Sequence, residues 1–182
     1  ESGVKRVVVA MQDPNPSVAG RGIQLLRDAG IEVEVGLLEE QARRLNERFI
    51  HNMLTSRPFV ISKFAMTLDG KIATYSGHSQ WITGEEARRH VHELRDEVDA
   101  ILVGVGTVLK DNPALTTRLQ TRNGKNPIRI VLDRELRTPL DAQIVQTSAA
   151  KTILVTAEGQ QHNASAFENL GVELLYVPVI DR

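Results

Sequence analysis

The sequence predicts an α/β fold, in which strands alternate with helices around a largely parallel sheet. Short β-branched apolar runs such as Arg6–Met11 and Ile128–Leu132 have the length and continuity of buried parallel strands. Stretches with helical apolar spacing fall between several of these runs. A hydrophobic fraction of 41% and a charged fraction of 25% over 182 residues are typical of a globular protein and exclude a disordered chain.

The first part of the chain predicts two strands and two helices. The opening apolar run stops at the two prolines of Asp13–Pro16, because proline fits neither a helix interior nor a central strand. The first helical pattern ends at Gly30, a natural helix stop. The expected elements, in order, are strand 6–11, helix 19–29, strand 31–35 and a single amphipathic helix over 39–54.

Pro58 marks a predicted boundary, because the residue before a proline is pushed out of the helical region. Apolar alternation over Phe59–Thr67 predicts a strand, and Asp69-Gly70 predicts a tight hairpin turn. The chain is then expected to return as a paired strand over Lys71–Thr74. These signals divide the chain into domains at 1–54 and 55–182.

The remainder of the chain predicts a helix followed by further alternation of strands and helices. Thr83 and Glu86 fit a capping box, so a helix is expected to follow Thr83 and to run to about Glu97. The later elements are expected at strand 100–103, helix 107–110, strand 128–132, strand 152–156, helix 163–170 and strand 172–177.

Composition excludes several classes of function. With 22 Lys and Arg against 23 Asp and Glu, the net charge of -1 argues against a general nucleic-acid-binding protein. The chain has no Cys, which excludes disulfides, thiolate zinc sites and iron–sulfur clusters within it. No window approaches about 20 apolar residues, and the N-terminus lacks the apolar core of a signal peptide. We therefore expect no membrane partner and a cytoplasmic location.

The five histidines do not predict a metal site. His90 and His92 are two residues apart on the predicted helix and point to different faces, so no metal is expected here. With His51, His78 and His162 they are expected at the surface.

Lys63 is the candidate that the strand pattern itself singles out. In the predicted strand it shares a face with Phe59, Ile61 and Ala65, and that face is otherwise apolar. Burial of a lone ammonium is costly without a partner, so Lys63 is predicted to line a site. A second pattern, Gly104-x-Gly106 after a strand, is too incomplete for a dinucleotide-binding fingerprint, and we reject a Rossmann assignment.

Several long motifs occur together in one order. They are KFAMTLDGKIA over Lys63–Ala73, GHSQWIT over Gly77–Thr83, GTVLKDNPALTTR over Gly106–Arg118 and PIRIVLD over Pro127–Asp133. These segments closely resemble the reductase domain of the bifunctional riboflavin-biosynthesis deaminase–reductase family. The resemblance covers residues from about 58 to the end and implies a dihydrofolate-reductase-like, mostly parallel sheet with flanking helices.

The resemblance implies an NADPH-dependent reduction of the ribosyl group of 5-amino-6-(5-phosphoribosylamino)uracil to ribityl. Lys63 would lie near the nicotinamide or the substrate. Ser79, Arg95, Leu115 and Arg118 match substrate contacts of the family, and Ala65, Trp81, Thr107, Asp111 and Arg134 match contacts of NADPH.

The residues alone leave other readings open for several of these positions. Arg95 and Arg118 could be solvated surface charges, and Trp81 could pack in the core. Asp111 could end a helix, and Arg134 could solvate a turn. Asp133 is expected to turn inward as a cap, because it would repel a cofactor phosphate.

The upstream segment resembles the end of the same family's zinc-dependent pyrimidine deaminase domain, which belongs to the cytidine-deaminase-like α/β/α class. The H-x-E and P-C-x-x-C motifs that hold zinc are absent from this chain. Residues 1–54 are thus expected to be the remainder of that domain, with zinc only in a part that precedes Glu1. A glycine-rich segment of the family is likewise expected beyond Arg182, and the enzyme is expected to be a homo-oligomer.

Two other functions remain open at this stage. The chain could be a catalytically incomplete fragment that acts only in assembly. It could also be a plain dihydrofolate reductase, although the phosphate-directed arginines and the deaminase-like segment argue against that reading.

Overall fold

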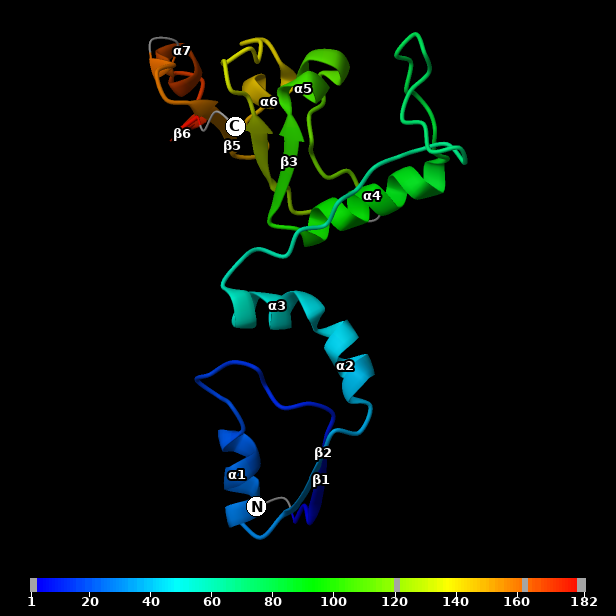
Figure 1. Ribbon diagram of the computed structural model, residues 1–182, viewed down its shortest axis with the longest axis vertical. Helices are drawn as coiled ribbons and strands as arrows, with labels where there is room; N and C mark the ends of the chain where they lie inside the picture. Colours follow the sequence, from blue (N-terminus) through cyan, green and yellow to red (C-terminus); the bar gives the residue numbers. More distant parts are fainter. Residues whose placement is uncertain (1–2, 120–121, 162–163, 180–182) are drawn as a thin grey trace. The chain divides into compact units, whose positions relative to one another are not determined.

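The computed structural model describes residues 3–119, 122–161 and 164–179. The chain divides into two compact units, Glu1–Phe64 and Ala65–Arg182, each built from helices and parallel strands (Figure 1). The predicted α/β class is confirmed. Across the described ranges, no helix combines the length and the hydropathy that a membrane crossing would require.

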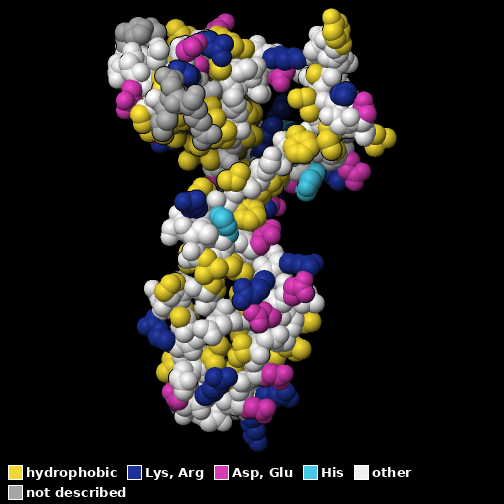
Figure 2. All heavy atoms as spheres, in the orientation of Figure 1, with side chains coloured by type: hydrophobic (Ala, Val, Ile, Leu, Met, Phe, Trp, Pro, Cys, Tyr) yellow, Lys and Arg dark blue, Asp and Glu magenta, His cyan; other side chains and the backbone are white. Residues whose placement is uncertain are grey.

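The first unit opens with a small β-α-β arrangement. Strand β1 (Arg6–Val9) pairs in parallel with β2 (Glu32–Val35), and α1 (Arg21–Asp28) connects them. The three elements lie where the sequence predicted them. Arg6 crosses between the strands to reach the Glu34 carboxylate at 2.5 Å. Figure 2 shows that acidic and basic side chains lie next to one another over the surface of this unit.

The single helix predicted over 39–54 is wrong, because the structure has two helices there. They are α2 (Glu39–Leu45) and α3 (Glu47–Thr55), separated at Asn46. The Asn46 side-chain amide donates a 2.8 Å hydrogen bond to the Ala42 carbonyl, and its backbone leaves the helical region at φ -106°. A short amide side chain competes with the backbone for helical hydrogen bonds. The prediction rested on the spacing of apolar residues, which gives no indication of that competition.

The strands predicted at Phe59–Thr67 and Lys71–Thr74 are also wrong. The tight turn between them forms, since the Thr67 and Lys71 backbones are hydrogen-bonded at 2.9 Å, but neither arm is a strand. Val60 and Phe64 are 80% and 62% exposed. A strand needs a partner for its backbone groups, and none of the described strands pairs with this segment.

Helix α4 (Glu85–Glu97) begins one residue later than the capping-box pattern predicts. Gly84 occupies the N-cap position and no side chain caps the helix. Thr83 instead uses its carbonyl to accept a 2.5 Å hydrogen bond from the Arg88 guanidinium. The predicted capping box is therefore absent, and the contact of Arg88 engages the Thr83 carbonyl rather than the free N–H groups of the first turn.

The second unit is built on a four-stranded parallel sheet in the order β3-β4-β5-β6. Its strands are β3 (Ala100–Gly104), β4 (Ile128–Leu132), β5 (Thr152–Ala157) and β6 (Glu173–Val177), as predicted. Helices α5 (Val105–Asp111), α6 (Gln143–Gln146) and α7 (Ala164–Glu168) accompany them. The prediction missed α6, and residue 163 of the predicted last helix lies outside the described residues.

One face of this sheet carries the core. Val131 and Leu154 are register partners with no exposed surface, and Val108 of α5, Ile144 of α6 and Phe167 of α7 pack in the same cluster. The opposite face is exposed: Leu102, Leu132 and Leu175 remain 57%, 47% and 51% accessible. The alternation along each strand assigns every side chain to one of these two faces.

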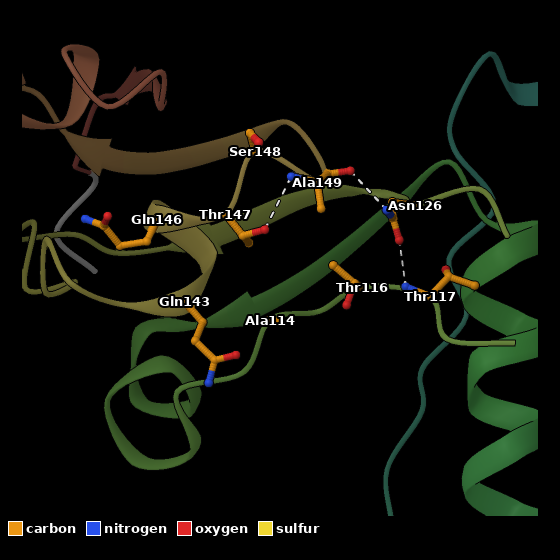
Figure 3. A pocket seen from close by; sticks show the side chains of 9 residues that line it. All are labelled: Ala114, Thr116, Thr117, Asn126, Gln143, Gln146, Thr147, Ser148 and Ala149. Carbon is orange, nitrogen blue, oxygen red and sulfur yellow. Dashed lines mark hydrogen bonds between the residues drawn. The ribbon is translucent and has the colours of Figure 1, made fainter. Parts of the chain in front are cut away.

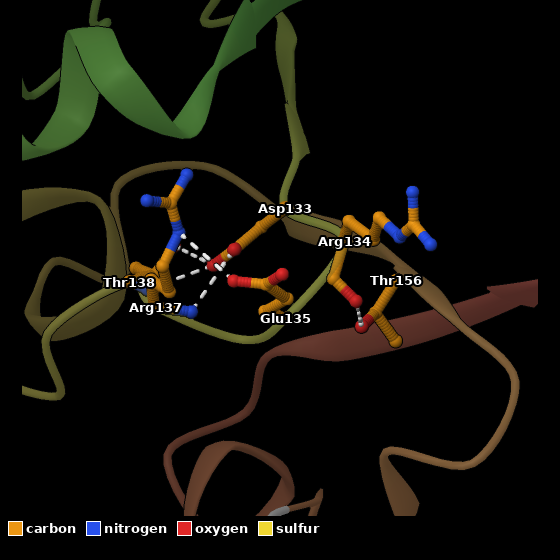
Figure 4. A network of polar contacts seen from close by, with 6 residues as sticks. All are labelled: Asp133, Arg134, Glu135, Arg137, Thr138 and Thr156. Atoms are coloured by element: carbon orange, nitrogen blue, oxygen red, sulfur yellow. Dashed lines mark hydrogen bonds and ion pairs between the residues drawn. The ribbon is translucent and has the colours of Figure 1, made fainter.

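Asp133, at the end of β4, organises the turn that follows (Figure 4). Its buried carboxylate accepts hydrogen bonds from the Arg137 backbone N–H at 2.9 Å and from the Thr138 backbone N–H and hydroxyl at 2.7 Å. The expectation that Asp133 turns inward is confirmed. The Arg134 carbonyl accepts a hydrogen bond from Thr156 on β5, so the turn is held against the sheet.

Replacement of Asp133 by Ala should destabilise the second unit by about 3 kcal/mol, because it leaves buried donors unpaired. Urea unfolding of the wild type and the variant measures this loss. Asp141→Ala, which removes an exposed carboxylate in the same region, is the control and should cost under about 0.5 kcal/mol. Equal losses in the two variants would contradict a structural role for the Asp133 network.

Candidate functional site

Residues 112–118, which follow α5, form a segment (the held segment) whose conformation is fixed by contacts along its length. Asn112 ends α5 in the left-handed region and accepts a 2.8 Å hydrogen bond from the Gln143 N–H. Leu115 has φ +51°, which is unfavourable for a branched residue, and its side chain is only 5% exposed. The Thr117 N–H donates to the Asn126 side chain at 2.8 Å. A buried anchor and side-chain acceptors thus fix the backbone that carries Leu115 and Arg118.

Two side chains of α4, one helical turn apart, form hydrogen bonds with the held segment. The Arg95 guanidinium donates to the Thr116 carbonyl at 3.2 Å. The Arg118 backbone N–H donates to Nδ1 of His92, also at 3.2 Å. Three of the predicted substrate residues, Arg95, Leu115 and Arg118, are therefore brought together by α4 and this segment.

The charges in this cluster are not balanced. Arg95 is half-buried, and its pKa is lowered first by burial and then by the nearby charge of Arg118. Neither arginine forms an ion pair with a carboxylate among the described residues, and Nε of Arg95 is buried without a hydrogen-bond partner there. Two neighbouring cations with an unused donor make a site for an anion.

His92 belongs to this cluster, and it is more buried than the expected surface position implies. It is half-buried, and its pKa is lowered by burial and by the charges of Arg95 and Arg118, while a hydrogen bond with the Thr116 backbone acts in the opposite direction. Sequence reasoning missed it because only metal spacing was considered. Its place three residues before Arg95, on the same helix face, was the available signal. His162 lies outside the described residues.

Asp96 fixes a second loop to α4 beside this cluster. Its carboxylate accepts a hydrogen bond from the Lys125 backbone N–H at 2.6 Å and pairs with Arg122. The backbone hydrogen bond and the Arg122 side chain together lower the pKa of Asp96. The carboxylate nearest to Arg95 in sequence is therefore already engaged by other donors.

Three of the predicted cofactor residues lie at or near the carboxyl edge of the sheet. Gly104 and Leu132 are register partners at the ends of β3 and β4, so the residues that follow them emerge at one edge. Thr107 lies in the first turn of α5, Asp111 is its last residue and Arg134 follows β4; all three are exposed. The turn after α5 is made by Asn112, so Asp111 is not needed to end the helix.

Trp81 is 71% exposed, so its alternative assignment to the core is wrong. The Arg88 guanidinium lies 4.6 Å from the centre of the Trp81 ring, within cation–π distance. Ala65 and Ser79 are half-buried, and no side-chain hydrogen bond or ion pair joins Ser79 to the arginine cluster among the described residues. A cavity of about 500 Å³ lies within the same stretch of chain and is lined in part by Asp69, Lys71 and His78.

Lys63 is exposed and belongs to the first unit. Since the segment around it is not a strand, the apolar face that singled it out does not form.

A larger hollow of about 650 Å³ is lined by uncharged side chains and lies beside the Thr116 end of the held segment (Figure 3). Asn126 bridges it, since its amide contacts both the Thr117 N–H and the Ala149 carbonyl. Its lining offers hydroxyl and amide groups but no cation, so it does not by itself suit a phosphate. Within the described ranges, no three His, Asp or Glu side chains gather as ligands for a metal.

Comparisons with known proteins agree on one family. The family model described as "RibD C-terminal domain" matches residues 58–177. The riboflavin biosynthesis protein RibD of Actinobacillus pleuropneumoniae is 51% identical over 96% of this chain and 46% of its own length. The RibD of Aquifex aeolicus is 49% identical over 96% of this chain and 48% of its own length. The chain thus spans about half the length of these relatives.

Two solved structures are similar over nearly the whole chain. One is a diaminohydroxyphosphoribosylaminopyrimidine deaminase/5-amino-6-(5-phosphoribosylamino)uracil reductase from Thermotoga maritima, with 39% identity, a TM-score of 0.75, and coverage of 96% of this chain and 54% of the other. The second is Acinetobacter baumannii RibD, with 39% identity, a TM-score of 0.77, and coverage of 97% and 49%.

Proposed function

The chain belongs to the RibD C-terminal domain family, and from this premise we propose that its second unit is part of a reductase of riboflavin biosynthesis. The proposed reaction is the NADPH-dependent reduction of the ribosyl group of 5-amino-6-(5-phosphoribosylamino)uracil to a ribityl chain. The family assignment argues against the alternative function of a plain dihydrofolate reductase.

The observation that carries this proposal is the uncompensated pair of cations, Arg95 and Arg118. The proposed substrate ends in a phosphate that carries nearly two negative charges at neutral pH. The guanidinium fork binds a phosphate through two parallel hydrogen bonds, and Nε of Arg95 is a buried donor with no partner among the described residues. Since α4 and the held segment fix the Arg95 guanidinium and the Arg118 backbone before any ligand arrives, little ordering is required on binding.

The residues at the carboxyl edge fit NADPH in their chemistry. When bound, this cofactor supplies the hydride that reduces C1′ of the ring-opened sugar. Thr107 and Asp111 offer exposed polar groups on α5, and the cation of Arg134 suits the 2′-phosphate that distinguishes NADPH from NADH. The exposed indole of Trp81, stacked on Arg88, offers an aromatic surface to a planar ring.

The chain's own residues contribute binding and orientation to this reaction. Arg95 and Arg118 would hold the phosphate end of the substrate, with Leu115 and Ser79 as further contacts, and so fix the position of C1′. Ala65 would contact the cofactor through its backbone. Lys63 remains a proposed catalytic residue, although the strand pattern that first indicated it does not form.

We further propose that residues 1–54 are the remainder of a zinc-dependent pyrimidine deaminase domain, joined to the reductase domain 55–182. The name of the Thermotoga maritima relative, which couples a deaminase with a reductase, supports this division. In this proposal zinc is held by a part of the protein that the present sequence does not include. A homo-oligomer in the cytoplasm completes the proposal.

Replacement of Arg95 or Arg118 by Ala in the full-length enzyme should lower kcat/KM about 10- to 150-fold, since each charged hydrogen bond contributes about 1.5–3 kcal/mol. The dissociation constant of NADPH should stay nearly unchanged. Arg89→Ala is the matched control, because Arg89 is exposed on the same helix and pairs with Glu93. A loss of NADPH affinity with intact substrate binding would refute the assignment of the cluster to the substrate.

Replacement of Arg134 by Ser should weaken NADPH binding by about 1–2 kcal/mol and NADH binding very little, since only NADPH carries the 2′-phosphate. Titration of both cofactors against both proteins measures the difference. Arg137→Ser serves as the control, because Arg137 lies in the same turn and pairs with Glu135 at 3.7 Å. Equal losses for the two cofactors, or no loss for NADPH, would remove Arg134 from the site.

A further inference from the structure

His92 lies close to both arginines of the proposed anion site, and none of the roles proposed so far involves it. It is the residue of α4 that contacts the Arg118 backbone, one turn away from the Arg95 contact with Thr116. The two contacts clamp one short stretch of backbone from the same helix face. Removal of either would release one side of the segment that carries Arg118.

The direction of the hydrogen bond determines the form of the imidazole. The Arg118 backbone N–H is the donor, so Nδ1 of His92 must be unprotonated and accept the bond. The ring is then neutral, with its hydrogen on Nε2. A doubly protonated ring cannot accept this hydrogen bond, and would place a third positive charge beside Arg95 and Arg118.

We propose that His92 is a positioning residue of the anion site, whose neutral imidazole holds the Arg118 backbone so that Arg95 and Arg118 face one phosphate group. This inference rests on the proposed function only in taking the ligand to be a phosphate ester. The clamp itself follows from the contacts of α4 with the segment.

The surroundings of the ring keep it neutral at physiological pH. The charged groups facing it are Arg95 from α4 and Arg118 from the held segment, and both are cations. Burial first, and then these two cations, lower the pKa of His92 below its ordinary value of 6.5, although a hydrogen bond with the Thr116 backbone opposes them. Protonation of His92 therefore requires a lower pH than protonation of an ordinary histidine. When it does, Nδ1 gains a proton and the Arg118 contact is lost.

The first experiment compares three variants of the full-length enzyme at pH 7.5. His92→Ala should raise KM for the phosphorylated substrate about 3- to 10-fold, the effect of one lost hydrogen bond, with kcat and NADPH affinity little changed. His92→Asn should restore KM to within about 2-fold, since an amide oxygen can replace Nδ1 as acceptor. His90→Ala is the control, because His90 is exposed on the same helix and pairs with Glu93.

The second experiment measures the affinity of inorganic sulfate by NMR titration between pH 7.5 and 5.5. Sulfate stays a dianion over this range, so only the protein titrates. The wild type should lose affinity as pH falls, because protonation releases Arg118, whereas His92→Asn should show a nearly flat profile. A gain in wild-type affinity at low pH would show that His92 acts as a third cation and would overturn the proposal.

The two experiments separate this inference from the proposed function. If Arg95→Ala and Arg118→Ala raise KM while His92→Ala does not, the phosphate assignment stands and the role of His92 falls. If His92→Asn is as impaired as His92→Ala, a positioning role through Nδ1 is excluded. Sulfate binding needs no turnover, so it tests the clamp even if the proposed substrate is wrong.

Discussion

The in-register parallel pairing of β3 with β4 is the constraint on which the second unit depends. It places Val103 beside Val131 and Gly104 beside Leu132, so side chains of one face point to α5, α6 and α7 together. Burial of this face supplies the main stabilisation of the unit, because apolar area removed from water is the dominant favourable term in folding. A shift of one residue would exchange the buried face for the exposed one. The parallel direction of the two strands brings Thr107 and Arg134, which follow their carboxyl ends, to the same edge.

The candidate site works against stability rather than for it. Arg95 is half-buried beside Arg118, and the two cations repel each other, with no ion pair to a carboxylate for either of them in the part of the chain that the structure describes. An unpaired charge taken out of water is unfavourable, and the surrounding structure must hold it in place. Asn112, Leu115 and Asn126 do so from the segment side. The arrangement becomes favourable when an anion supplies the missing charge, and this is the physical basis for assigning a phosphate to it.

The candidate residues are divided between different structural elements. The arginines come from α4 and the segment after α5, whereas Thr107, Asp111 and Arg134 come from α5 and the turn after β4. The rigid parts are therefore the sheet and α4, and the chemistry lies on the segments between them. Such a division is typical of α/β proteins, in which connections carry the functional groups and the regular elements fix their positions.

The amino-acid sequence by itself determined the strands of the sheet, because β-branched apolar runs of this length have few other stable conformations. It also determined the family, and with it Arg95 and Arg118 as candidates. It could not determine which extended segments find a partner, since pairing is a long-range property, and Phe59–Thr67 remained unpaired for that reason. Only the tertiary structure showed that Asn46 divides a helix, that Trp81 is exposed and that His92 contacts Arg118. The exposure of Trp81 and the contact of His92 depend on which groups meet across the fold, whereas the break at Asn46 comes from a local side-chain hydrogen bond. Apolar spacing along the chain carries no information on either.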